Sequence, residues 1–540
     1  MNFLNKFAVL PLIAFSYPLF AQNTSNLHLL KSIDPVPVPG DPRRYGEVTG
    51  CGDLAAIAGW YFDDNSRNVY LYDVSTPQAP RQLAVVPSTA AIWDVQIHGR
   101  YLYFAVQNQG YIDVYDLIDP VHPVLVNHFQ PGDPSISPHT FWVTGRGLYI
   151  ANHLVPGVTV FDLTNKRSFV YMGLFNNDFG TAHDNTVIHN KLYTAFIFSP
   201  AGLWTADVSD LSAPKPLAGA QYPGAGTHNA WPTEDERYIL TTDEIGATEH
   251  NLKIWDTQSG ALELVAEYAT QPGAIIHNVY VRGRYAYLSY YCEGIRIVDI
   301  NDPRHPVQVA SYDLNGNTPC SGYSSTWGIY PFSRYIYASD MNLGLHLFDF
   351  DQHPPANLTG AVTDAVTGAA IPGAYVYFPD EYATTRTSAN GAYEIPWFKD
   401  DHVRVAADAL GYQADTLETN TTADGNTELN FALRKSSTAV DEKPENMPQK
   451  FALHANYPNP FNPATTITYD LPGAAHVMLK IYDMLGQEVR TLIDAWQEAG
   501  STSLTWDGRD HAGQILPSGV YFYRLQAEGF AQTRKLVVMR

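Results

Sequence analysis

The sequence predicts an all-β protein: a seven-bladed β-propeller followed by two small, immunoglobulin-like β-sandwich domains. A unit of about forty-five residues recurs seven times between Tyr45 and Asp351, and this period is typical of propeller blades. Each unit contains a hydrophobic strand that closes on an aspartate. These aspartates are Asp73, Asp116, Asp162, Asp207, Asp256, Asp299 and Asp349. After residue 355 the repeat stops, and two further groups of short strands follow, separated by Gly and Asp turns.

Each unit of the predicted propeller, residues 22–352, supplies four short antiparallel strands, which make one blade. In one unit the strand Trp93–Ile97 is followed by a tight turn at His98–Arg100 and by the strand Tyr101–Ala105. The seventh unit lacks a fourth strand, whereas Leu27–Ile33 has the form of a fourth strand with nothing in front of it. We therefore expect Leu27–Ile33 to complete blade seven and to close the ring, which would remove the exposed strand edges of a linear array.

The first residues have the features of a secretory signal peptide. Lys6 precedes an apolar stretch from Phe7 to Phe20, and Ala21 provides a small residue for cleavage, so residues 1–21 are expected to be removed. This stretch is too short to span a bilayer, and no later stretch reaches the ~18 apolar residues that a transmembrane helix needs. The mature chain is therefore expected outside the cytoplasm, without a transmembrane span.

The charge balance limits the classes of partner. A formal net charge of −22 and a pI near 5.1 argue against nucleic acid, because phosphate contacts need clustered Lys and Arg. Three cysteines leave at least one unpaired. We expect a disulfide between Cys292 and Cys320, which fall on the same face of neighbouring strands in an exported protein, and a free thiol at Cys51.

The repeats resemble the LVIVD family of exported bacterial propellers, whose name reflects the strand written here as Ile295-Arg-Ile-Val-Asp299. The resemblance implies the fold and implies no particular reaction. Residues 355–435 resemble the carboxypeptidase regulatory-like domain through Gly360-Ala-Val-Thr-Asp364, Asn390-Gly-Ala-Tyr393 and Gly411-Tyr412. That resemblance implies a non-catalytic accessory sandwich. Residues 436–449 hold no apolar run and are expected to form a linker.

Residues 450–540 resemble the C-terminal sorting domain of the type IX secretion system. The matching segments include Asn456–Pro463, Trp506-Asp-Gly508, Ser518–Tyr521 and Lys535–Val537. The resemblance implies the type IX machinery as a partner. It also implies export through the periplasm of a Gram-negative bacterium, with the protein secreted or held at the outer cell surface.

Histidines recur at one position of the repeat. Alignment of the blades on their second strands places five residues where the innermost strand begins, and His228 joins them if blade five carries one extra residue. These positions ring the upper mouth of the central channel, and the five are Trp93, His139, His183, His277 and Trp327. Neutral imidazole is a good ligand for zinc, copper or iron, so His139, His183, His228 and His277 form a candidate metal site. The loop after the second strand of blade five adds Asp243 and Glu244 on the same face, as ligands, as hydrogen-bond acceptors for a ligand, or as a general base.

A structural role for these histidines is the alternative. WD-repeat propellers also carry a histidine before the innermost strand, where it braces the blade by bonding to a turn aspartate. Here the histidine occurs in blades three to six only, whereas a necessary brace would recur in all seven. The strand-end aspartates are expected to cap the turns that follow them.

Three functions follow from these observations. The first is an exported platform that binds an unknown protein, glycan or small molecule. The second is a metal-dependent hydrolase or oxidase with its centre at the channel mouth, and the third is an envelope scaffold without a small-molecule ligand. We favour the platform, with no certain cofactor and no assigned catalytic residue.

Overall fold

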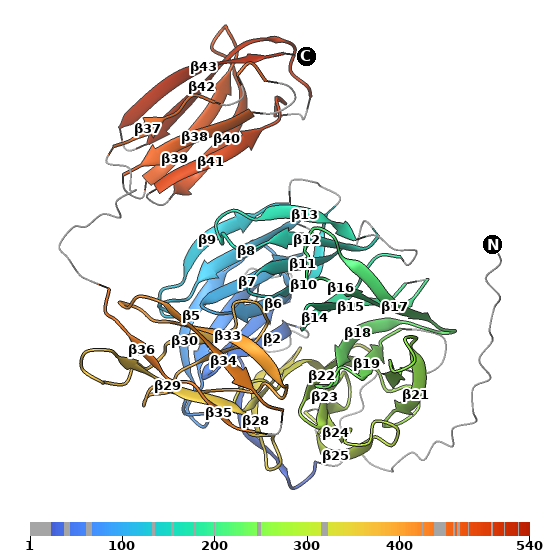
Figure 1. Ribbon diagram of the computed structural model, residues 1–540. Helices are drawn as coiled ribbons and strands as arrows, with labels where there is room; N and C mark the ends of the chain where they lie inside the picture. Colours follow the sequence, from blue (N-terminus) through green and yellow to red (C-terminus); the bar gives the residue numbers. More distant parts are fainter. Residues whose placement is uncertain are drawn as a thin grey trace. The chain divides into compact units, whose positions relative to one another are not determined.

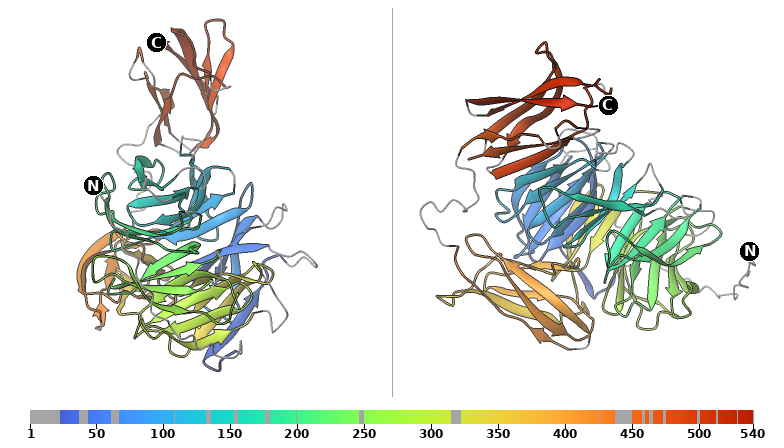
Figure 2. Two further views of the ribbon diagram at one scale, coloured as in Figure 1. Left: turned by 90° about the vertical axis from the view of Figure 1, so that its right-hand side faces the viewer. Right: turned by 45° about the horizontal axis from the view of Figure 1, so that its top comes forward.

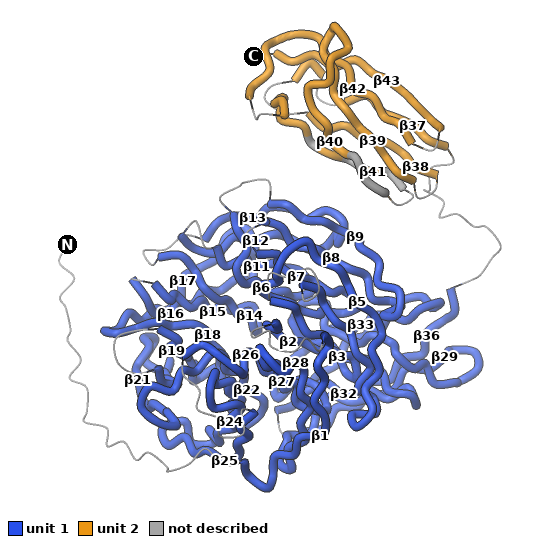
Figure 3. Tube along the Cα trace, turned by 180° about the vertical axis from the view of Figure 1, so that it is seen from behind, with its two compact units in different colours: residues 1–436 blue, residues 437–540 orange. Residues whose placement is uncertain are grey.

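A computed structural model describes residues 23–539, apart from residues 37–43, 61–66, 108, 132–135, 153–155, 176–179, 199, 246–249, 315–321, 424, 437–449, 457–458, 462–464, 473–474, 498–499, 512–513 and 528. The predicted signal peptide and residues 437–449 of the predicted linker lie outside the described residues. The described part consists of strands, turns and loops and contains no helix, which confirms the all-β class. The chain forms two compact units, residues 1–436 and residues 437–540 (Figure 3).

Seven four-stranded antiparallel sheets surround one axis in the first unit, as the repeat predicts (Figures 1 and 2). The innermost strands are β2 (Tyr45–Cys51), β6 (Ile92–His98), β10 (Pro138–Val143), β14 (Asp184–Ile188), β18 (Thr227–Pro232), β22 (Ile276–Arg282) and β26 (Thr326–Tyr330). The second strands are β3 (Leu54–Gly59), β7 (Tyr101–Val106), β11 (Gly147–Asn152), β15 (Lys191–Phe196), β19 (Tyr238–Asp243), β23 (Tyr285–Tyr290) and β27 (Ile336–Asp340). The third strands are β4 (Asn68–Asp73), β8 (Tyr111–Asp116), β12 (Val158–Asp162), β16 (Gly202–Asp207), β20 (Leu252–Asp256), β24 (Gly294–Asp299) and β28 (Gly344–Phe350).

The fourth strands form the rim of the propeller. They are β5 (Arg81–Pro87), β9 (Val124–Phe129), β13 (Val170–Phe175), β17 (Lys215–Gln221), β21 (Glu263–Tyr268), β25 (Val307–Tyr312) and β1 (Leu27–Ile33). The first three strands of each blade are buried along almost their whole length, because adjacent blades cover both of their faces. The rim strands are mostly exposed or half-buried. This stacking explains why the inner strands have continuous apolar sequences, whereas the rim strands mix polar and apolar residues.

The N-terminal strand closes the ring. β1 pairs antiparallel with β28, from Leu27 opposite Phe350 to Ile33 opposite Leu345. Blade seven is therefore built from both ends of the propeller sequence, in the order β1-β28-β27-β26, and the closure predicted from the sequence is confirmed.

The strand-end aspartates cap turns, as predicted. Asp73 accepts a hydrogen bond from the backbone N–H of Ser75 at 3.0 Å, and Asp299 accepts one from Asn301 at 2.8 Å. The equivalent aspartates of blades two to five accept the same bond from the residue two positions on. Their regularity therefore reflects blade architecture.

The innermost strands are irregular near the predicted histidine position. The register of β6 against β7 shifts between Ile92 and Asp94, and that of β10 against β11 shifts between Pro138 and Thr140. β2, β18, β22 and β26 carry shifts at the equivalent place. A β-bulge inserts one extra residue and re-aims the side chains beside it. Two consecutive residues of each of these strands thereby reach the channel.

Residues 357–436 form a β-sandwich in the same compact unit as the propeller. One sheet contains β29 (Leu358–Asp364), β32 (Ala392–Ile395), β35 (Thr427–Glu428) and β36 (Phe431–Leu433), and the other contains β30 (Tyr375–Tyr377), β31 (Thr384–Arg386), β33 (Asp401–Asp408) and β34 (Asp415–Thr421). The sequence predicts strands near Leu358–Val362, Ala374–Phe378, Ala392–Ile395 and Val403–Ala407, which correspond to β29, β30, β32 and β33. Their inward residues, including Val376, Val405 and Trp397, make a separate core.

This middle sandwich covers the lower face of the propeller, where the turns between first and second strands lie. The imidazole Nε2 of His98 is 2.7 Å from the backbone oxygen of Glu381, and the guanidinium of Arg100 pairs with Asp408 at 2.9 Å. Tyr382 packs on Trp142 and Trp231, with ring centroids 6.0 and 5.7 Å apart. The sandwich therefore closes the end of the channel opposite the predicted histidine position.

The second unit is another β-sandwich. One sheet contains β37 (Ala452–Leu453), β38 (Thr465–Leu471) and β41 (Gly500–Trp506), and the other contains β39 (Ala475–Tyr482), β40 (Glu488–Gln497), β42 (Gly519–Ala527) and β43 (Phe530–Val538). Its core includes Trp506, which packs on Phe461 with ring centroids 5.6 Å apart. The sequence predicts strands at Thr465–Tyr469, His476–Tyr482, Ser501–Trp506 and Gly519–Leu525, which correspond to β38, β39, β41 and β42. The short β37 was not predicted, nor were β40 and β43, because charged and polar residues occupy many positions of these two long strands.

Candidate functional site

The predicted histidine position forms a closed ring of seven aromatic side chains at the upper end of the channel. We call it the mouth ring. Neighbouring ring centroids lie between 4.1 and 6.4 Å apart around the whole circle. In order, the members are Trp60, Trp93, His139, His183, His228, His277 and Trp327. All four predicted histidines are present, and His228 occupies the place that one extra residue in blade five predicted.

Blade one completes the mouth ring in a different way. Its residue at the ring position is Gly46, and a Cβ atom there would lie 3.3 Å from the Cβ of Trp60. Trp60 follows the second strand of blade one and fills the vacant place, with its ring 5.1 Å from that of Trp327. The sequence alignment missed Trp60, because it compared only innermost strands.

The four histidines are buried, and the pKa values of His228 and His277 are lowered. His139, His183, His228 and His277 are between 3% and 8% exposed. Burial lowers the pKa of His277 to about 4. Burial, together with the neighbouring imidazoles, lowers the pKa of His228 well below its usual value. Neutral imidazole is the form that binds a metal ion.

One backbone contact fixes the tautomer of His277. Its Nδ1 donates to the backbone oxygen of Trp327 in the next blade at 2.7 Å. Because Nδ1 carries the proton, the lone pair belongs to Nε2. Metal-binding histidines are commonly oriented by such a bond from the other ring nitrogen. The same bond links blades six and seven, so His277 also has a bracing role.

The spacing of the other imidazoles matches ligand geometry. The Nε2 atoms of His139 and His183 are 3.0 Å apart. Two nitrogens bound to one ion at about 2.0–2.1 Å lie about 2.9–3.4 Å apart, for bond angles between square and tetrahedral. The two imidazoles are therefore already at a distance that a shared metal ion would impose.

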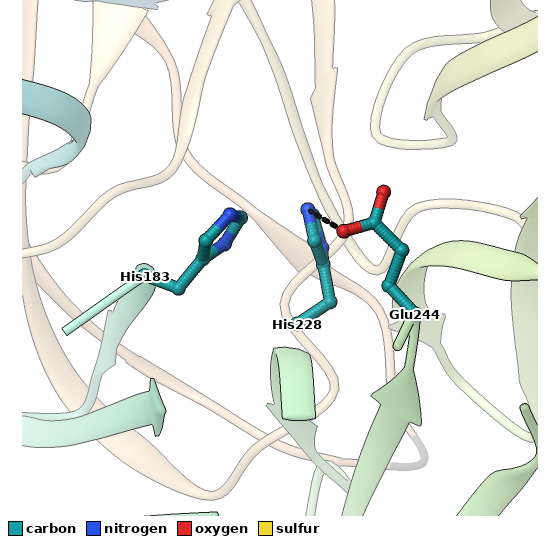
Figure 4. A group of neighbouring side chains, drawn as sticks. All are labelled: His183, His228 and Glu244. Carbon is teal, nitrogen blue, oxygen red and sulfur yellow. Dashed lines mark ion pairs between the residues drawn. The ribbon is translucent and has the colours of Figure 1, made fainter. Parts of the chain in front are cut away.

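Glu244 joins two of the histidines (Figure 4). The ligand atoms of His183, His228 and Glu244 all lie within 4.8 Å of one another, and Nε2 of His228 is 3.8 Å from Oε2 of Glu244. The hydroxyl of Tyr291 donates to Oε1 of Glu244 at 2.5 Å. Burial raises the pKa of Glu244 to about 7, although the bond from Tyr291 lowers it. The arrangement offers two nitrogens and one oriented carboxylate to a cation.

Asp243, the other predicted carboxylate, lies elsewhere. It pairs with Lys253 at 2.7 Å and accepts a hydrogen bond from the hydroxyl of Tyr222 at 2.6 Å. It does not line the cavity below the mouth ring. Successive residues along an extended chain point to opposite faces, so Asp243 and Glu244 lie in different environments. Asp243 is part of a buried ion pair.

A second layer of polar side chains lies directly below the mouth ring. These residues follow the ring position, and in every blade except the fourth a bulge lies beside them. We call this set the polar layer, and its members are Glu47, Asp94, Thr140, Asp184, Asn229 and Asn278. Blade seven contributes Gly328, where a Cβ atom would lie 2.3 Å from Oε1 of Glu47, so the missing side chain leaves room for that carboxylate.

The carboxylates of the polar layer are strongly perturbed. Burial, and then repulsion from Asp184, raises the pKa of Glu47 to about 7. Burial raises the pKa of Asp184 to about 6. Burial and the charge of Glu47 raise the pKa of Asp94 well above its usual value. These carboxylates face one another across a common cavity, and strong perturbation of this kind is a feature of functional sites.

The polar layer and all members of the mouth ring except Trp60 line one cavity of about 200 Å³. Trp142 and Tyr280 form part of its lower wall. A smaller cavity of about 50 Å³ lies between these residues and Tyr382 of the middle sandwich. The channel therefore passes from imidazoles through carboxylates to aromatic rings, and the sandwich closes it below.

The cysteines follow the prediction as far as they are described. Cys292 is disulfide-bonded, and Cys51 is a buried free thiol whose pKa burial raises to about 12. The predicted partner of Cys292, Cys320, lies outside the described residues. A thiol with so high a pKa is not a nucleophile at neutral pH.

Comparisons with known proteins agree with this architecture. The model of the LVIVD repeat matches residues 91–130 and 275–314, which correspond to blades two and six. The model of the carboxypeptidase regulatory-like domain matches residues 357–434, and that of the FlgD Ig-like domain matches residues 461–529. The chain therefore contains LVIVD-type propeller repeats and two immunoglobulin-like domains. No curated protein sequence matches it.

Solved structures are similar at low identity. One is a chain from a complex of S. cerevisiae Dbp5 and Gle1 variants with Nup159, IP6 and ADP, at 11% identity and a TM-score of 0.43, covering 62% of this chain and 97% of that chain. Another is the C-terminal WD40 domain of Sif2, at 12% identity and a TM-score of 0.41, covering 58% of this chain and 83% of that chain. In the part of the chain that the structure describes, no helix has the length and apolarity to cross a membrane.

Proposed function

We propose that this chain is an exported binding propeller whose mouth ring holds a transition-metal ion, which anchors a ligand at the channel mouth. His183, His228 and Glu244 are the proposed ligands, with His139 or His277 in a further position. The observation that carries the proposal is the convergence of three ligand atoms within 4.8 Å at a buried site. Closing this group around one ion requires side-chain movements of about 1 Å.

The surroundings of these ligands support the proposal. The Nε2 lone pair of His277 is set by its bond to the Trp327 backbone, and Tyr291 orients Glu244. Such outer contacts pre-orient ligands and strengthen metal binding. A set of imidazoles with one carboxylate suits zinc, copper or iron better than magnesium or calcium, which prefer all-oxygen sites.

Metal analysis of the purified chain tests the proposal. Unstripped protein, and stripped protein reloaded with zinc, copper or iron, should carry one ion per chain. His183→Ala, His228→Ala and Glu244→Gln should each reduce the metal content to below a fifth of that of the parent. His346→Ala is the matched control, because His346 is equally buried at 1% exposure but bonds to Ser32 away from the mouth ring.

The bracing interpretation gives a different result in the same experiment. If the histidines only brace the blades, His183→Ala and His277→Ala should lower the melting temperature, and neither the parent nor any variant should carry metal. Absence of stoichiometric metal in unstripped and reloaded protein would refute the proposed centre.

We also propose that residues 450–540 are a type IX sorting domain and that residues 1–21 are a signal peptide. The match to the FlgD Ig-like domain and the sorting-domain motifs of the sequence support this proposal. The protein would then be secreted by, or held on the surface of, a Gram-negative bacterium. A fluorescent reporter fused to residues 450–540 should reach the medium or cell surface of a host with the type IX system. Retention in the periplasm of that host would contradict the assignment.

A hydrolase or an oxidase that uses the same metal is the alternative function. Turnover of ester, phosphoester or reducing substrates by the metal-loaded chain, lost in His228→Ala, would favour it over binding alone.

A further inference from the structure

We infer that the cavity below the mouth ring binds a small organic ammonium ion, with its nitrogen in the polar layer and its carbon skeleton against the indole and phenol rings. The inference rests on the proposed function in that it names the ligand class of the same site. It depends on side chains other than the proposed metal ligands, so the two can fail separately.

The charge of the cavity wall selects a cation. Apart from the proposed metal ligand Glu244, the wall contains the carboxyl groups of Glu47, Asp94 and Asp184 and no lysine or arginine. Each carboxylate is at most partly exposed, and the anionic form is therefore poorly hydrated. Buried carboxylates need a cationic partner or a proton. With an anionic or neutral ligand these carboxyl groups must take up protons, whereas an ammonium ion balances their charge directly.

The hydrogen bonds within the polar layer favour a ligand that donates hydrogen bonds. The amide nitrogens of Asn229 and Asn278 already donate to Asp184 at 2.7 Å and to Glu47 at 3.2 Å. The hydroxyl of Thr140 donates to the backbone oxygen of His183 at 2.6 Å. The hydroxyl and one N–H of each amide are thus used within the protein, and they hold the amides against the carboxylates of Asp184 and Glu47.

An acceptor is left over in the same layer. Oδ1 of Asn278 is buried and, among the described atoms, has no hydrogen-bond partner, although the residue is only 3% exposed. A buried acceptor without a donor costs free energy. An ammonium group, which offers up to three N–H donors and no acceptor, complements a wall of acceptors.

The aromatic walls favour an organic cation over an inorganic one. Trp93, Trp327, Trp142 and Tyr280 line the cavity together with the polar layer. Cations on alkyl or aryl groups gain from contact with such ring faces. Among the described residues, the carboxyl oxygens of Glu47, Asp94 and Asp184 do not form a group within 4.8 Å, so they do not make a compact cage for a bare metal ion.

The size of the cavity limits the ligand. A volume of about 200 Å³ equals that of about six or seven water molecules at about 30 Å³ each. Trp142, Tyr280 and Tyr382 close the lower end. The chamber therefore accepts a small amine or the amine-bearing end of a larger molecule, and excludes a folded protein or a branched glycan.

Calorimetry with three probes of one shape tests the inference. Benzylamine, benzyl alcohol and benzoate differ in charge but hardly in size, and each is titrated into the full chain at pH 7.5, both metal-stripped and metal-loaded. Benzylamine should bind at least tenfold more tightly than benzyl alcohol in both forms, and benzoate should not bind. Equal affinity for the amine and the alcohol, or tighter binding of benzoate, would overturn the inference.

Isosteric variants locate the ammonium group. Asp94→Asn combined with Glu47→Gln should weaken benzylamine binding at least tenfold and leave benzyl alcohol binding unchanged. Glu234→Gln is the matched control, because Glu234 is a half-buried carboxylate whose pKa burial also raises to about 7, but it accepts a bond from Gly283 at the lower face. A melting curve of each variant verifies folding. Retained amine affinity in the folded double variant would refute the assignment.

The two proposals separate cleanly in this design. Amine binding by stripped protein that takes up no metal would remove the metal centre and support the ammonium site. Metal uptake by a chain that ignores benzylamine in both forms would support the centre and overturn the ammonium site.

Discussion

The N-terminal strand should contribute to the stability of the whole propeller, and Leu27→Ala tests this directly. Leu27 is 3% exposed and packs in one core cluster with Tyr285, Ile295 and Phe350, which belong to blades six and seven. Truncation of a buried leucine costs about 2–5 kcal/mol, depending on how well the site collapses. Because β1 is a rim strand, we expect the lower part of that range, about 2–3 kcal/mol.

His28→Ala is the matched control in the same strand. His28 faces solvent and pairs with Asp351 at 3.0 Å, with both side chains about half exposed. Exposed ion pairs contribute about 0–1 kcal/mol. The control should therefore change stability by less than half as much as Leu27→Ala.

Hydrogen exchange followed by mass spectrometry reports the effect strand by strand. β28 lies between β1 and β27, so its amides are protected by the closure. A loss of about 2–3 kcal/mol corresponds to exchange that is about 30- to 150-fold faster. We expect this acceleration in β28 and in the blades on either side, with a lower urea midpoint for the propeller.

One result would refute the cooperative closure. If Leu27→Ala accelerates exchange in β1 alone and leaves β28 and the urea midpoint unchanged, β1 is a locally attached strand that frays independently.

Three further substitutions test other contacts. Tyr382→Ala removes the ring that packs on Trp231. The substitution should lower the free energy of unfolding by about 3 kcal/mol and lower the urea midpoint of the first unit. An unchanged midpoint would show that this ring contact does not stabilise the propeller. Burial lowers the pKa of His98 to about 3. Below about pH 6.5 the imidazole is therefore protonated in the unfolded chain but stays neutral in the folded chain. Stability should fall from about pH 6.5 toward pH 3 by up to about 1.4 kcal/mol per pH unit, and urea titrations of His98→Gln across this range should lack that contribution; the same slope in parent and variant would contradict it. Asp243→Asn leaves Lys253 buried without its main partner. In urea titrations it should destabilise the chain by about 3 kcal/mol, and the metal content should not change. A loss of metal would show that Asp243 is a metal ligand.

Much of the fold follows from local patterns in the sequence. The strand that ends in aspartate repeats because each blade needs the same capped turn after its third strand, as the bond from Ser75 to Asp73 illustrates. The ring closure was predictable because Leu27–Ile33 and the incomplete seventh unit are complementary. β40 and β43 were not predicted. Each has one exposed face, and polar residues such as Glu488 and Lys535 interrupt the apolar residues by which a strand is recognised.

The site was predictable in part. The four histidines were identified because they occupy one repeat position, and Glu244 because its loop opens on the same face. Trp60 was missed, since it reaches the mouth ring from a different strand to replace the side chain that Gly46 lacks. The polar layer was not predicted as a set. If side chains alternate strictly along a strand, a residue such as Asp94 points toward the neighbouring blade. The bulge that turns it into the channel cannot be recognised in the sequence.

The sequence by itself determined the number of blades, the closing strand, the order of the domains and the imidazoles at the channel mouth. These depend on period, alternation and turn chemistry, which are local properties repeated along the chain. The tertiary structure decided which carboxylate joins the histidines, and it brought Glu47, Asp94 and Asp184 from three blades into one cavity. It also placed Tyr382 of the middle sandwich at the closed end of the channel. Distances between residues of different blades depend on bulges, on the packing of neighbouring blades and on domain docking, which the residue pattern of a single blade does not encode.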